Sequence, residues 1–99
     1  MNFVTAQPEL LAIAAGQLQV IGTALTAQNS ATAIPMTGVL PAAADEVSLV
    51  TAAQFARHGQ MFQALSAQAA AIHENFVTTL QTSAGSYAAT EAANAVAAR

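Results

Sequence analysis

The side chains that could carry chemistry are few, and their spacing does not form an active site. His73-Glu74 begins like the HExxH signature of zinc proteases, but Val77 stands where the second histidine is required. His58 lies 15 residues before His73, which on one helix is about 22 Å, too far to share a metal ion. The carboxylates are scattered singly, and the sequence contains no GxSxG motif and no glycine-rich phosphate loop. We therefore expect no catalytic residue, no metal site and no cofactor.

Three other residues, one histidine and one tyrosine–glutamate pair, have both an ordinary and a functional interpretation. His58 lies within an apolar pattern, which favours a hydrogen-bonded interface histidine, with a pH-sensitive contact as the alternative. Tyr87 and Glu91 are spaced i, i+4, so on a helix they share one face. They are either an isolated aromatic and an isolated acid, or a short export or docking signal. Their spacing alone does not decide between the two.

The composition predicts a domain that needs a partner. Of 99 residues, 55% are hydrophobic and only 7% are charged. Alanine occurs 27 times, against four phenylalanines, one tyrosine and no tryptophan. A small domain already buries a limited fraction of its surface, and alanine adds little apolar area to a core. We therefore expect the chain to be a poor monomer.

The charge balance and the apolar runs exclude several other classes. A net charge of −3 without any lysine argues against nucleic-acid binding and against an electrostatic membrane anchor. The longest unbroken apolar run, about residues 10–15, is shorter than the ~20 residues of a membrane span. Met1–Val4 has no basic residue, and Pro8-Glu9 interrupts the hydrophobic stretch that a secretory signal peptide requires.

Residues that favour helix starts and helix ends predict two long helices. Pro8 is favourable in a first helical turn, and Pro35 is expected to end that helix. Asp45-Glu46 is an acidic helix start, and Gly85 is a plausible C-cap. The predicted organisation is a helical domain over residues 1–86, with a helix over about 8–33, a connector over 34–44 and a helix over about 45–84, followed by a tail over 87–99.

Apolar residues recur along both predicted helices at steps of three and four. A short connector makes them antiparallel neighbours, so the predicted fold is all-α, a long two-helix hairpin. Two helices leave apolar flanks uncovered, and such strips are typical of binding surfaces. The hairpin is therefore expected to complete a bundle with a partner protein. The predicted interface residues are Leu11, Leu18, Ile21, Leu25, Phe55, His58, Phe62, Leu65, Ile72, Phe76 and Leu80.

Several ordered segments together resemble the mycobacterial PE family over nearly the whole chain. They are Pro8-Glu9, Ala44-Asp45-Glu46-Val47-Ser48, His58-Gly59-Gln60, Leu65-Ser66-Ala67-Gln68-Ala69-Ala70-Ala71, His73, Phe76-Val77 and Tyr87-Ala88-Ala89-Thr90-Glu91-Ala92-Ala93. The resemblance implies a PE domain that pairs with a PPE protein in a four-helix bundle and leaves the cell through a type VII (ESX) secretion system. The family's PE dipeptide corresponds to Pro8 and Glu9, and its YxxxD/E export motif corresponds to Tyr87 and Glu91.

The same resemblance implies an EspG-type cytosolic chaperone that binds the PPE partner rather than this chain. It also implies a cytosolic complex before export and a secreted or cell-envelope location afterwards. Two alternatives stay open. The chain is either a complete short PE protein or the N-terminal targeting domain of a longer one with an enzymatic or repeat domain. A homodimer resembling the WxG100 class is disfavoured, because the connector carries no WxG motif.

Overall fold

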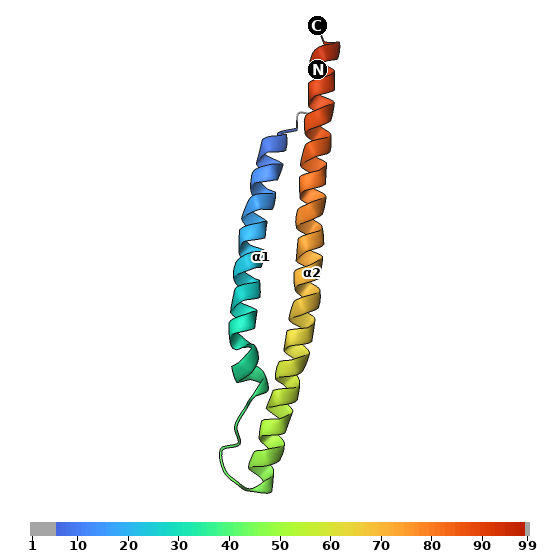
Figure 1. Ribbon diagram of the computed structural model, residues 1–99. Helices are drawn as coiled ribbons and strands as arrows, with labels where there is room; N and C mark the ends of the chain where they lie inside the picture. The colour runs from blue at the N-terminus through green and yellow to red at the C-terminus, as the bar shows by residue number, and fades with distance from the viewer. Residues whose placement is uncertain (1–5, 99) are drawn as a thin grey trace. The chain divides into compact units, whose positions relative to one another are not determined.

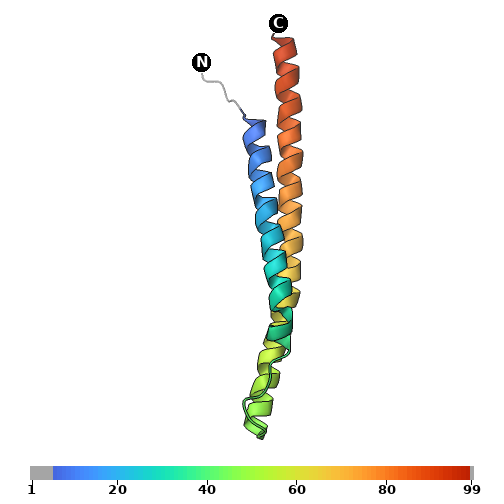
Figure 2. The ribbon, with the colours of Figure 1, turned by 60° about the vertical axis from the view of Figure 1, so that its left-hand side comes forward.

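The computed structural model of the chain describes residues 6–98. Residues 1–5, the start of the predicted helical domain, and Arg99, the end of the predicted tail, lie outside the described residues. The described part consists of two helices, α1 (Pro8–Thr37) and α2 (Glu46–Ala97), and contains no strand (Figure 1). Segments of α1 lie beside α2 and run antiparallel to it, as a second view also shows (Figure 2). The predicted all-α hairpin is therefore confirmed.

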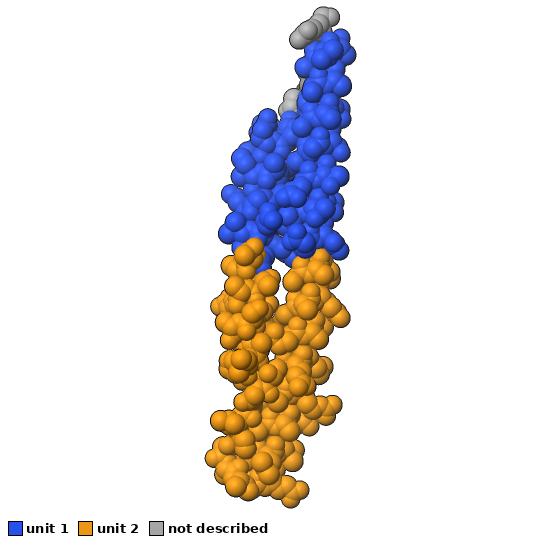
Figure 3. All heavy atoms as spheres, in the orientation of Figure 1, with its two compact units in different colours: residues 1–22, 73–99 blue, residues 23–72 orange. Residues whose placement is uncertain are grey.

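The hairpin divides into two compact units, each made of one segment from each helix (Figure 3). In unit 1, the described residues up to Gly22 pair with those from His73 onward. Unit 2 is the continuous segment Thr23–Ile72, which contains the connector between the helices.

Both helices begin at the residues that the sequence indicates. Pro8 lacks the N–H that would have no partner in a first turn, and the amides of Leu10 and Leu11 donate to the Gln7 carbonyl at 3.0 and 3.4 Å. Asp45 caps α2, because its Oδ1 accepts a hydrogen bond from the Ser48 amide at 2.7 Å. Hydrogen bonds from Ser48, the hydroxyl first and the backbone amide second, hold the pKa of Asp45 below its ordinary value of 3.8.

The predicted end of the first helix is wrong, because α1 continues through Pro35 to Thr37. A proline in the last turn removes one helical hydrogen bond, a smaller loss than in the middle of a helix. Other donors stabilise this turn. The Gly38 amide donates to the Ile34 carbonyl at 2.8 Å, and the Thr37 hydroxyl donates to the Ala33 carbonyl at 2.7 Å. The connector is accordingly residues 38–45, shorter than predicted.

The predicted end of the second helix is also wrong, because α2 passes through Gly85 and ends at Ala97. No glycine in the described range has a positive φ, so Gly85 does not form the left-handed cap that the prediction required. One internal glycine costs a helix about 1 kcal/mol relative to alanine. The segment beyond it is rich in alanine, the best helix former, which offsets that cost.

The length of α1 corrects the sequence-based argument about membranes. By length and composition alone, its 30 residues suffice to cross a membrane, although no unbroken apolar run does. Helices of soluble proteins pass the same test, so this property is weak evidence for a membrane span.

Candidate functional site

The faces on which the two helices meet are built mainly from small side chains. In unit 1, the buried residues are Ala15, Val77 and Ala84. In unit 2, Ala52 and Gly59 are buried. Along α2 the inner positions follow steps of three and four, as one face of a helix requires. They are Ala52, Ala56, Gly59, Gln63, Ser66, Ala70, His73 and Val77.

The large apolar side chains of both helices lie outside this contact. In unit 2, Leu25, Phe55, Phe62, Leu65 and Ile72 are between 44% and 69% exposed. In unit 1, Ile21 and Phe76 are likewise about half exposed. We call these seven residues the apolar strip. Phe55, Phe62 and Phe76 are separated by multiples of seven residues, so they recur on one side of α2.

Three predicted interface residues are placed differently from the strip. Leu11, Leu18 and Leu80 are half-buried, because they lie at the margin of the contact between the helices in unit 1. His58 is exposed and belongs to the same side of α2 as Phe55 and Phe62. The predicted seam on α2 is therefore mainly an exposed surface rather than the core of the hairpin.

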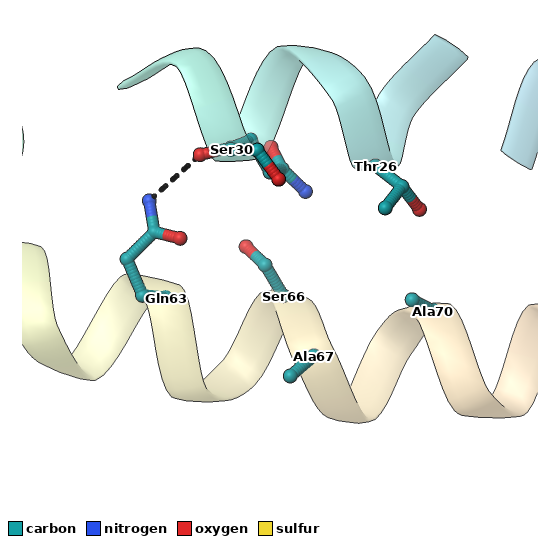
Figure 4. A pocket seen from close by; sticks show the side chains of 7 residues that line it. Thr26, Ser30, Gln63, Ser66, Ala67 and Ala70 are labelled. Atoms are coloured by element: carbon teal, nitrogen blue, oxygen red, sulfur yellow. Dashed lines mark hydrogen bonds between the residues drawn. The ribbon is translucent and has the colours of Figure 1, made fainter. Parts of the chain in front are cut away.

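A polar hollow of about 140 Å³ lies between the helices of unit 2 (Figure 4). It is lined by Thr26, Asn29, Ser30, Gln63, Ser66, Ala67 and Ala70. The Gln63 amide nitrogen donates to the Asn29 carbonyl at 3.2 Å and reaches the Met36 sulfur at 3.5 Å. The lining supplies hydroxyl and amide groups but no charged side chain, so it can hydrogen bond and offers no acid, base or activated nucleophile.

The two histidines lie in different surroundings. His73 points toward α1 in unit 1, where its Nε2 lies 2.6 Å from the Leu18 carbonyl oxygen. Because a carbonyl oxygen only accepts hydrogen bonds, Nε2 carries the proton. His58 is exposed in unit 2. Across the described residues, no three histidine, cysteine or acidic side chains gather in a way that could hold a metal ion.

Tyr87 and Glu91 both lie on α2, beyond the predicted helix end. Tyr87 is half exposed and Glu91 is exposed. Their i, i+4 spacing therefore places the phenol and the carboxylate on one face of a formed helix, accessible to solvent. At the start of α1, Pro8 is half-buried and Glu9 is exposed.

Sequence reasoning missed the residues that join the helices. Gly22 and Gly59 allow the closest approaches. A Cβ on Gly22 would lie 2.7 Å from the His73 ring, and one on Gly59 would lie 2.7 Å from the Met36 carbonyl carbon. The sequence pattern that indicates this contact is the recurrence of small residues at helical spacing on α2. The larger residues of the neighbouring stripe form a stronger hydrophobic pattern, which masks it.

Comparison with known proteins agrees with the early resemblance. The chain is 62% identical over 98 residues to the PE family protein PE13 of Mycobacterium tuberculosis (strain ATCC 25618 / H37Rv), covering 99% of both chains. It is 56% identical over 95 residues to the PE-PGRS family protein PE_PGRS33 of the same strain, but covers only 19% of it. It is 55% identical over 95 residues to a protein named esterase PE16, of which it covers 18%.

The relatives thus include one protein of the same length and longer proteins of which this chain matches about a fifth. The sequence model of the PE family matches residues 4–94 of this chain. The chain therefore belongs to the PE family.

Proposed function

We propose that this chain is a non-catalytic module that pairs with a PPE protein and directs the pair through a type VII (ESX) secretion system. The observation that supports the proposal most strongly is the placement of side chains, which is the reverse of that in an ordinary hydrophobic core. Each unit buries mainly small residues and leaves most of its large apolar residues exposed. Burial of apolar area supplies most folding free energy, so a partner that covers these residues adds stability by mass action.

The arrangement of exposed residues favours a partner on one side of the helices. On α2, Phe62 belongs to the apolar strip, whereas Gln60 and Glu74 lie on other arcs of the same helix. A partner that also presents two helices would cover the strip in a four-helix bundle. For a permanent complex we expect a large, apolar interface, on the order of 2,000 Å² or more.

Export is assigned to Tyr87 and Glu91, which share an exposed helical face. Because Tyr87 is half exposed and Glu91 is exposed, we expect the pair to contribute little to the contact between the helices. An EspG-type chaperone would act through the PPE partner in the cytosol. The exported complex would then be secreted or reside in the cell envelope.

A second candidate function follows from the longer relatives. Because this chain matches only 18–19% of the proteins named PE_PGRS33 and esterase PE16, a sequence of this kind also forms one part of larger proteins. The alternative proposal is a targeting domain whose cargo is a downstream enzymatic or repeat region. A self-sufficient homodimer of the WxG100 type is less well supported.

A secretion assay with co-purification from the same mycobacterial cells tests the proposal. We expect Tyr87→Ala and Glu91→Ala each to block export while the PE–PPE complex still forms in the cytosol. Glu91→Asp should be tolerated better than Glu91→Gln if the negative charge is recognised. Asn94→Ala, an exposed change on the same helical segment, is the matched control. Normal secretion of the Tyr87→Ala protein would refute the export signal.

A further inference from the structure

The contact between His73 and α1 is directional, unlike most of the surrounding packing. His73 Nε2 donates to the Leu18 carbonyl oxygen at 2.6 Å. The same carbonyl accepts the helical hydrogen bond from the Gly22 amide four residues later, and its two lone pairs allow both bonds. The ring lies where a side chain at residue 22 would otherwise be. A Cβ there would stand 2.7 Å from Cδ2 and 2.8 Å from Nε2.

Small side chains define the alignment of two helices poorly. In unit 1 the buried residues are Ala15, Val77 and Ala84. Where the buried residue is alanine, a slip by one turn exchanges one small group for another, so packing at these positions separates the two alignments only weakly. A single polar group between helices is the best-attested device for selecting one register, because the wrong alignment leaves it unpaired.

We propose that His73 is a positioning residue, which together with the Gly22 notch and the Leu18 carbonyl fixes the register of α1 against α2 in unit 1. The correct register brings the exposed Ile21 and Phe76 into the arrangement that the partner recognises. The inference rests on the proposed PE–PPE pairing, because that pairing gives the register its use.

Three substitutions of His73 separate its donor from its volume. His73→Gln keeps an N–H donor of similar reach, His73→Phe keeps a ring without a donor, and His73→Ala keeps neither. Gly22→Ala fills the notch and forces the ring away from the Leu18 carbonyl. Gly16→Ala is the matched control, since a Cβ there meets no atom within 4 Å.

The register is measured by the distance between two spin labels on the full chain, purified in complex with a co-expressed PPE protein. Cysteines introduced at the exposed Gln17 and Gln81 carry the labels, and the natural sequence contains no other cysteine. A slip by one turn moves one helix about 5.4 Å along the other. We expect one narrow distance distribution for the unsubstituted chain, for His73→Gln and for Gly16→Ala. We expect a shifted or broadened distribution for His73→Phe, His73→Ala and Gly22→Ala.

Capture of the PPE protein is measured separately on the same variants. Loss of the register should weaken capture about tenfold or more for His73→Phe and Gly22→Ala, the change expected from one lost hydrogen bond of about 1.4 kcal/mol. An unchanged label distance in His73→Phe would overturn the register role, and a changed distance with normal capture would overturn the docking role. If the unsubstituted chain binds no PPE protein, the proposed function fails, and the register inference that rests on it fails too. If the chain binds the PPE protein but all variants give the same label distance, only the register role of His73 fails.

Discussion

The two units of the hairpin join the same two helices by different means. Unit 1 packs aliphatic side chains around Val77, which is 1% exposed, and adds the hydrogen bond from His73. Unit 2 has the polar hollow, which is open to solvent, and its backbones approach most closely where Gly59 meets Met36. Neither unit buries a phenylalanine among its described residues. The difference shows that the pairing of the helices tolerates varied chemistry, whereas the exposure of large apolar residues is common to both units.

This comparison separates two roles within one sequence. Inner residues align the helices and contribute modest stability, because they are small or polar. Outer residues hold most of the apolar area that remains available for burial. Substitutions in the two classes should therefore affect different measurements, and the four predictions below are ordered from the largest expected effect to the smallest.

The largest effect is expected from a charge within the apolar strip of either unit. Phe62→Asp in unit 2 and Phe76→Asp in unit 1 should each abolish binding of the PPE protein, because burying an unpaired carboxylate costs several kcal/mol. The measurement is co-purification after co-expression. Gln60→Asp, two residues from Phe62 on another arc of α2, should bind almost normally. Equal losses from Phe62→Asp and Gln60→Asp would contradict the assignment of faces.

A methyl group at the closest approach in unit 2 should destabilise the hairpin. Gly59→Ala places a Cβ against the backbone of Met36, which cannot move as a flexible side chain can. We expect a loss of roughly 1–3 kcal/mol in the free energy of unfolding of the complex. Denaturant titration followed by circular dichroism measures it. In unit 1, a Cβ on Gly16 meets no atom within 4 Å, so Gly16→Ala should instead stabilise the protein. If both variants lose stability, the loss in Gly59→Ala does not come from the close approach to Met36.

An alanine at Gly85 tests the continuous helix at the far end of unit 1. Because α2 passes through this residue without positive φ and no atom lies within 4 Å of its ideal Cβ, Gly85→Ala should stabilise the helix by roughly 0.5–1 kcal/mol. Thermal unfolding followed by far-ultraviolet circular dichroism records this gain as a higher Tm. A marked loss would indicate the left-handed C-cap that the sequence first suggested.

The smallest effect is expected from the Asp45 cap at the start of α2 in unit 2. Its folded-state pKa lies below 3.8, so its stabilising contribution is present above that pH and is lost as the pH falls through the lowered pKa. Asp45→Ala should lower the Tm slightly near neutral pH, and the difference from the unsubstituted chain should shrink in acid. A Tm difference that grew on acidification would contradict this sign.

The sequence predicted the helix starts better than the helix ends. Pro8 and Asp45 act locally, through a missing N–H and a side-chain cap, so their effect does not depend on distant residues. Pro35 and Gly85 were expected to stop helices, but each opposes helix formation by an amount that neighbouring residues offset. Thr37 and Gly38 stabilise the turn around Pro35, and alanines follow Gly85.

The candidate surface was predictable as a set of residues but not as a position in the fold. The periodicity of Phe55, Phe62 and Phe76 marks one face of α2, yet an apolar face suits a core as well as an interface. Which face meets α1 is decided by close approach at Gly22 and Gly59, a property of two helices together. The residue pattern along a single helix therefore cannot show which of its faces packs against the other helix.

The most direct test of the account compares the chain expressed alone with the chain co-expressed with a PPE protein. Native mass spectrometry gives the stoichiometry of each sample, and thermal unfolding of the same samples gives the cooperativity. We predict a 1:1 complex with a cooperative thermal transition when the two are made together, and aggregated or poorly folded protein when the chain is made alone. The reason is that the large apolar residues are exposed until a partner covers them. A monodisperse monomer of the chain alone with a sharp thermal transition, together with failure to bind any PPE protein, would contradict the account.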